Sequence, residues 1–358
     1  MNTPTTYTGS VGRHNEGRPK AARRRTTRGR RLHGRALAAV VLVGLLSWTG
    51  RSVGQDIHFS LVDVNPILFN PAYSGFFDGT GRFGVAYRNQ WATVSAPFQT
   101  FAATGEIALV KRRYNRDGFG LGLILLGDRA GSLHYGTVSG TGVLSYYAAI
   151  NNYNFLSVAF EAGYGQTGFD ASLAKFQEPN DPLTDQNVAY PLVGAGVAWY
   201  FGPTDSFRMK VGVAAHNLNQ PKLTYLNTDD ARVYRRYNAY ARLELRQWVT
   251  FSLLPMVAVQ VQNQYRELMA GTEAKWYLSE TRGQLFALSV GAYYRWRDAA
   301  LVTATVEHND FVYSIGYDVN LSKLTPASHT VGAFELQLVY RLGMQSKIKH
   351  KAMPCPII

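Results

Sequence analysis

Beyond residue 81, apolar and polar residues alternate with a period of two, in stretches of about ten residues that are separated by turn residues. In residues 284–296, Phe286 and Val290 fall on one face, whereas Ser289 and Arg295 fall on the other. Successive side chains of a β-strand point to opposite faces of the sheet. No window shows sustained helical periodicity, and no apolar run reaches the length of a membrane helix. This pattern is typical of a transmembrane β-barrel.

The alternation predicts an all-β protein, an antiparallel barrel of the outer-membrane type with about 14 strands. An even number of strands is what such a barrel needs if both of its ends are to face the periplasm. A soluble β-sandwich is the alternative that the alternation alone leaves open. The predicted strands are 82–91, 98–110, 117–126, 134–149, 153–167, 189–201, 207–217, 234–246, 249–262, 265–278, 284–297, 299–308, 311–322 and 330–342.

Loop lengths predict the orientation of this barrel. The two longest connections, 169–188 and 218–233, follow the fifth and seventh predicted strands. Outer-membrane barrels carry long loops outside the cell and short turns on the periplasmic side. Connections after even strands are short, with Lys111–Arg116 as the longest exception. Odd strands are therefore expected to end outside the cell.

Ionisable residues fall on the polar face of the predicted strands, which would line the lumen. Buried charges must be paired or hydrated, because an unpaired buried charge is costly. The signs are mixed, so we expect polar networks that cross-link the lumen and not a selectivity ring of one sign. These residues are Glu106, Glu161, Arg242, Glu244, Glu273, Lys275, Glu307 and Glu335.

Composition supports one large barrel, because aromatic residues make up 13% of the chain and charged residues only 17%. The net charge of +13 would ordinarily indicate nucleic acid, but residues 1–54 hold 11 Lys and Arg against the single acid Glu16. The leader thus carries +10, and the remaining chain only +3. An arginine-rich stretch, the apolar run Ala36–Leu46 and the small residues Ser52-Val53-Gly54 predict a cleaved signal peptide over 1–54.

Two flanking segments complete the predicted organisation. Residues 55–81 are expected to form a periplasmic arm, 82–342 the barrel, and 343–358 a basic tail with the only cysteine, Cys355. Within the arm, Asn65-Pro66 and Asn70-Pro71 predict turns, because proline fixes its own φ and restricts the residue before it. The apolar residues between them would anchor the arm against a partner surface or under the rim of the barrel.

The arm also carries a resemblance. The pattern Gln-Asp-x-x-Phe-Ser from Gln55, followed by Asn-Pro-x-x-x-Asn-Pro-Ala-Tyr-x-Gly up to Gly75, resembles the start of the mature PorP/SprF family of outer-membrane proteins. The resemblance continues in Tyr87-Arg88-Asn89-Gln90-Trp91, Tyr317-Asp318-Val319-Asn320, Thr325-Pro326-Ala327-Ser328, Gly332-Ala333-Phe334-Glu335 and Cys355-Pro356.

The resemblance implies a non-enzymatic barrel in the outer membrane that acts in or beside type IX secretion. The expected partners are outer-membrane lipid, periplasmic type IX secretion components and a secreted surface cargo protein such as an adhesin, without nucleic acid. We expect the arm to contact the lumen or a periplasmic partner. The candidate partner-binding residues are Asn65, Pro66, Phe69, Asn70, Pro71, Tyr73, Arg88, Asn89, Gln90 and Trp91.

Other chemistry has little support in the sequence. Nucleotide-binding, zinc-protease, serine-hydrolase and Cys-x-x-Cys motifs are absent, so no catalytic residue, metal or cofactor is predicted. His308-Asn309-Asp310 is a polar strand end that could also be read as a fragment of a hydrolase site. Loop acids such as Asp181 and Asp229 lack regular calcium-ligand spacing. A passive porin or substrate transporter is the alternative function.

Overall fold

The computed structural model of the chain describes residues 59–77, 79–90, 97–111, 117–131, 135–168, 187–223, 232–281, 284–321 and 331–343. The predicted signal peptide, most of the loop 169–188, the tail, and the residues Trp91, Asp181 and Asp229 lie outside this part of the chain.

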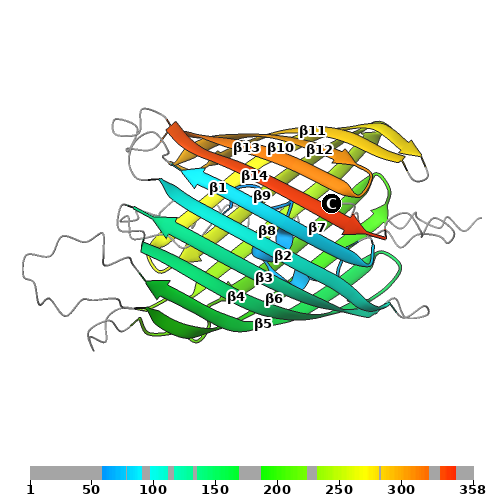
Figure 1. The fold of residues 1–358 in the computed structure, drawn as a ribbon. Helices are drawn as coiled ribbons and strands as arrows, with labels where there is room; N and C mark the ends of the chain where they lie inside the picture. Colours follow the sequence, from blue (N-terminus) through cyan, green and yellow to red (C-terminus); the bar gives the residue numbers. More distant parts are fainter. Residues whose placement is uncertain are drawn as a thin grey trace, which may run out of the picture. The chain divides into compact units, whose positions relative to one another are not determined.

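Fourteen antiparallel strands close into one barrel (Figure 1), which confirms the predicted fold class and strand number. Each strand pairs with its neighbours in the chain, and β1 pairs with β14 to close the ring, with Gly81 opposite Leu342. The strands are β1 (Gly81–Gln90), β2 (Phe98–Lys111), β3 (Gly118–Ala130), β4 (Tyr135–Ala149), β5 (Asn154–Gly168), β6 (Val188–Thr204), β7 (Phe207–His216), β8 (Arg236–Trp248), β9 (Phe251–Gln262), β10 (Tyr265–Thr281), β11 (Gln284–Arg295), β12 (Ala299–His308), β13 (Phe311–Asn320) and β14 (Val331–Leu342).

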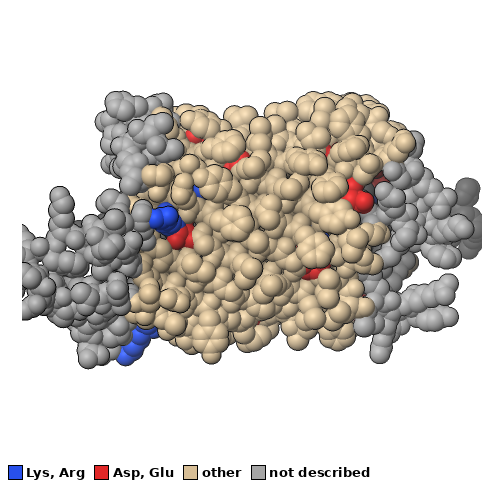
Figure 2. All heavy atoms as spheres, in the orientation of Figure 1, with Lys and Arg blue, Asp and Glu red and all other residues tan. Residues whose placement is uncertain are grey.

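The alternation along the strands becomes a division between the outside and the inside of the barrel. On β11, the side chains of Phe286 and Val290 are exposed, whereas those of Ser289 and Arg295 are buried. The face drawn in Figure 2 accordingly carries few charged side chains. An apolar exterior around a polar interior is the arrangement that a barrel in lipid requires.

Two short 3₁₀ helices precede the barrel, η1 (Pro66–Leu68) and η2 (Pro71–Tyr73). A proline begins each helix, where its missing N–H costs no hydrogen bond and its fixed φ suits a helical turn. Asn70 caps η2, because its side-chain oxygen accepts the N–H of Ala72 at 2.9 Å. The predicted Asn-Pro turns are therefore present. In the described part of the chain, no helix is both long and apolar enough to span a membrane.

Candidate functional site

The described part of the arm, residues 59–77, lies inside the barrel (Figure 1). Ser60 contacts β13 and β14 beside β1, while Asp63 bonds to Tyr240 on β8. In the ring of fourteen strands, β8 lies halfway around from β1. The arm therefore crosses the lumen from one wall to the other. The sequence predicts that the arm contacts either the lumen or a periplasmic partner, and in the structure the arm contacts the lumen.

The N-terminal end of the arm is held through its backbone. Glu335 on β14 accepts the N–H groups of Ser60 and Leu61, at 2.7 and 2.9 Å. Gln337, two residues further along β14, donates to the carbonyl oxygen of Leu61 at 3.2 Å. The side chain of Glu335 is completely buried. Because the bonds reach main-chain atoms, they position this segment whatever side chains it carries.

Charged side chains surround the same point. Arg88 donates to the Ser60 hydroxyl at 2.7 Å, to Glu335 at 3.0 Å and to Asp318 at 2.8 Å. Arg295 donates to Asp318 at 3.0 Å and also bonds to the Ser60 hydroxyl. We call Arg88, Arg295, Asp318 and Glu335 the mouth cluster. Its two cations face two anions, so the buried charges compensate each other, as burial requires.

Polar contacts continue along the arm. Asp63 pairs with Arg242 and accepts a hydrogen bond from Tyr240, both on β8. Asn65 donates to the hydroxyl of Thr104 on β2 at 2.8 Å. Buried polar groups without partners are costly. These two side chains therefore match specific positions on opposite sides of the lumen.

The second Asn-Pro turn binds the wall formed by β6, β7 and β8. The amide nitrogen of Asn70 donates to the carbonyl oxygens of Val197 and Val213, at 3.1 and 3.2 Å. The carbonyl oxygen of Phe69 accepts a bond from Asn238 at 2.8 Å. His216 lies 3.2 Å from the same oxygen and 2.5 Å from Glu161.

Glycines in the wall allow the arm to approach the strand backbone. A Cβ atom at Gly122 on β3 would lie 2.6 Å from Cδ1 of Ile67. At Gly212 on β7 it would lie 2.6 Å from the amide nitrogen of Asn70. Real Cβ contacts are essentially never this short. Because neither position leaves room for a side chain, the wall and the arm are shaped to each other.

The C-terminal half of the arm packs through apolar side chains. Ile67 packs with Ile124 and Val143 of β3 and β4. Phe76 lies among Tyr147, Phe155 and Tyr200, whose ring centroids are 5.4 to 5.9 Å from its own. Tyr73 meets Tyr240 edge to face, at 6.1 Å. This half of the arm thus has a small hydrophobic core inside the barrel.

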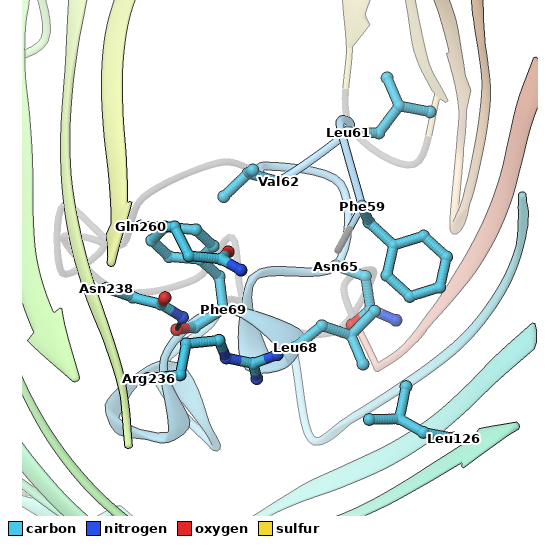
Figure 3. A pocket seen from close by; sticks show the side chains of 10 residues that line it. All are labelled: Phe59, Leu61, Val62, Asn65, Leu68, Phe69, Leu126, Arg236, Asn238 and Gln260. Carbon is cyan, nitrogen blue, oxygen red and sulfur yellow. Dashed lines mark hydrogen bonds between the residues drawn. The ribbon is translucent and has the colours of Figure 1, made fainter. Parts of the chain in front are cut away.

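Two small cavities adjoin the arm. One, of about 20 Å³, is shown in Figure 3 and lies between arm residues such as Phe59, Leu68 and Phe69 and the strand residues Asn238 and Gln260. The other, of about 70 Å³, lies beside Leu68 against β3 to β8. A single water molecule needs roughly 10–15 Å³ of such space. Each cavity therefore has room for only a few water molecules.

The wall itself carries the predicted network of mixed charge. Ion pairs join strands around the ring, and most of their side chains are buried. These pairs are Arg82–Glu106 at 2.8 Å, Arg208–Glu244 at 3.4 Å, Arg242–Glu273 at 3.5 Å, Arg341–Glu307 at 3.1 Å and the close pair Lys275–Glu307.

The structure places most of the sequence-predicted site residues in the lumen or on its wall, and Trp91 lies outside the described residues. Asn65, Pro66, Phe69, Asn70, Pro71 and Tyr73 lie in the lumen, and Arg88 belongs to the mouth cluster. Asn89 and Gln90 are half-buried at the end of β1. Whether these residues bind a partner stays a prediction.

Sequence reasoning missed Ser60, Leu61, Asp63 and Arg295 as functional residues. A signal for part of this set was present, because Ser60, Arg88, Asp318 and Glu335 all belong to the motifs that carried the family resemblance. Separate along the chain, these four residues meet at the mouth cluster.

In the described residues, the arrangement of side chains supports neither a hydrolase site at His308 nor a metal site. His308 is exposed on the outward face of β12, where its ring stacks edge to face on Phe286 at 5.9 Å. Among the described residues, no group of three or more His, Cys, Asp or Glu side chains is placed to hold a metal ion.

A closed antiparallel barrel with an apolar exterior and a polar interior defines an outer-membrane β-barrel protein. The family model of the type IX secretion system membrane protein PorP/SprF matches residues 52–340. The chain belongs to the PorP/SprF family.

Solved barrels resemble this one at low sequence identity. A FadL homologue of Pseudomonas aeruginosa is 12% identical with a TM-score of 0.46, over 76% of this chain and 92% of that one. The CymD monoaromatic hydrocarbon channel is 8% identical with a TM-score of 0.45, over 81% and 95%. BamA of Haemophilus ducreyi lacking POTRA domains 1–3 is 9% identical with a TM-score of 0.41, over 74% and 70%. A search of curated proteins found no match.

Proposed function

We propose that this protein is a non-enzymatic barrel of the cell outer membrane that supports the secretion or surface attachment of cargo, such as adhesins, in or beside type IX secretion. It is exported through a cleaved signal peptide over residues 1–54. Its partners are periplasmic type IX secretion components and a secreted surface protein. Membership of the PorP/SprF family supports this proposal.

The observation that carries the proposal is the occupied lumen. Arg88, Asp318 and Glu335 of the family motifs hold Ser60 at the mouth cluster, and Asn70 of the arm bonds to the wall at β6 and β7. A passive porin needs a continuous water-filled path. The two cavities beside the arm are small, with volumes of about 20 and 70 Å³. A barrel whose lumen is crossed by such an arm suits a scaffold for protein partners better than a pore for solutes.

The proposal is tested by affinity purification of the detergent-solubilised native protein, followed by mass spectrometry of the proteins that co-purify. We expect a large surface protein, periplasmic secretion components, or both. A second outer-membrane barrel with the same tag is the control for proteins that bind any barrel. Purification of this barrel alone, in repeated preparations, would count against the proposal and favour the porin.

A further inference from the structure

The arm runs along the lumen from one end of the barrel to the other. It leads into Gly81, which pairs with Leu342 at the end where β1 begins and β14 finishes. The mouth cluster lies toward the opposite end, because Arg295 is the last residue of β11 and Asp318 is near the end of β13. The connections from β5 to β6 and from β7 to β8 are attached at that same end. These are the two longest connections in the barrel.

The two halves of the arm are held in different ways. Residues 66–77 pack on β3 to β7 through η1, η2 and the apolar clusters around Ile67 and Phe76, and on β8 to β12 through the cluster around Tyr73. Residues 59–65 make polar contacts to β1, β2, β8, β13 and β14, and Val62 also packs in an apolar cluster with residues such as Tyr240 and Leu301. The first half therefore combines buried polar bonds with the apolar packing of Val62, whereas the second packs mainly through apolar side chains.

We propose that the arm is a plug that seals the lumen to ions and small solutes, and that the mouth cluster is the latch that holds it closed. Releasing Ser60 and Leu61 from the latch frees the first residues of the arm, 59–61, and opens the lumen beside β13 and β14. The latch is buried and lies toward the end of the barrel where the long loops are attached. The proposal is independent of which cargo the protein serves.

Glu335 is the residue whose loss should release the latch. It is the acceptor for two backbone N–H groups of the arm and a partner of Arg88. In Glu335→Gln, the new amide places a donor where the arm and Arg88 also present donors. The bonds to Ser60 and Leu61 cannot all be kept, because an amide accepts only through its oxygen.

The test is single-channel current in planar lipid bilayers, with the full-length purified protein. We expect closed barrels for the unaltered chain and discrete current steps for Glu335→Gln. The matched control is Glu307→Gln, which alters another buried carboxylate that pairs with the wall residues Lys275 and Arg341. The control should stay closed. Heat-modifiable migration on gels establishes that each variant is a folded barrel.

A second variant keeps the test independent of any folding defect. The hydroxyl of Ser60 lies 3.2 Å from the carboxylate of Asp318, so Ser60→Cys with Asp318→Cys, added to Glu335→Gln in a Cys355→Ser background, replaces the ionic latch by a thiol pair. We expect current steps in the reduced form, and their loss once the pair is bridged by oxidation or a short bifunctional thiol reagent.

Three results would overturn the proposal. The first is steady conductance of the unaltered protein. The second is a Glu335→Gln barrel that is folded and as closed as the control. The third is current through the thiol-pair variant that does not differ between its reduced and bridged forms.

Discussion

Arg88 illustrates how a buried ion pair in this barrel serves position as much as stability. Its guanidinium joins Ser60 of the arm to Asp318 and Glu335 of two different strands. Replacing a whole buried network by apolar residues can be neutral, but removing one partner leaves the others uncompensated. The arginine is therefore needed because its two acidic partners are present.

We predict that Arg88→Met destabilises the folded barrel by about 3–5 kcal/mol, since it strands the buried carboxylates of Asp318 and Glu335. The measurement is the urea dependence of unfolding from lipid vesicles. Arg129→Met is the matched control, because Arg129 is an exposed residue at the same end of the barrel. A surface substitution of this kind changes stability by about 0.5 kcal/mol or less. Equal effects of the two changes would contradict this account of the cluster.

A second prediction concerns the contact between wall and arm. Gly122→Ala places a methyl group against Ile67, and overpacking of this kind costs about 1–3 kcal/mol. Gly127→Ala, on the same strand, is the control, because a Cβ at Gly127 meets no atom within 4 Å. We expect faster proteolysis of the arm in Gly122→Ala only. Unchanged protection of the arm would mean that the wall gives way instead.

At the scale of elements, the arm and the barrel have separate sources of stability. The strands bond to one another around the closed ring, whereas the arm contributes no strand to it. A barrel can therefore form its hydrogen-bond ladder without the arm. The arm, by contrast, has only short 3₁₀ helices of its own, and helices of this length are not stable in water without packing.

We predict that deletion of residues 55–75 leaves a heat-modifiable barrel in the outer membrane but abolishes cargo display at the cell surface. Cargo is measured by surface immunofluorescence, and barrel assembly by gel migration. Replacing the same residues by a Gly/Ser linker of equal length controls for signal-peptide processing. Loss of the folded barrel in both variants would show that the arm is structural.

The two 3₁₀ helices of the arm show which of its features the sequence could predict and which it could not. The Asn-Pro pairs predicted two turns, and both are present because proline geometry acts within a few residues. The same pairs could not predict that Asn70 would bind the carbonyl oxygens of Val197 and Val213. That contact joins residues far apart in the chain, so it depends on how β6 and β7 are placed in the ring.

At the scale of the whole molecule, the exterior decides where the barrel is stable. Exposed apolar side chains such as Val290 on β11 and Val302 on β12 cover the outer face. We predict that Val290→Arg destabilises the barrel in lipid by about 2–4 kcal/mol, because a charge at mid-bilayer depth must be desolvated. Phe286→Arg, two residues from the start of β11, is the control and should cost about 0–1 kcal/mol.

Urea titration of folding into vesicles measures both Val290→Arg and Phe286→Arg. We expect Val290 to lie deeper in the bilayer than Phe286. Similar costs at the two positions would contradict this expectation. Loss of folding in detergent as well as in lipid would place the defect in packing and not in the lipid contact.

The sequence by itself determined the strand number, the two faces of each strand and the turns of the arm. Each of these follows from a local rule, either the alternation of side chains along a strand or the fixed φ of proline. Only the tertiary structure decided that the arm lies in the lumen and that Ser60, Arg88, Asp318 and Glu335 meet. Their meeting requires β1 to close the ring against β14, and no local pattern records which residues ring closure will bring together.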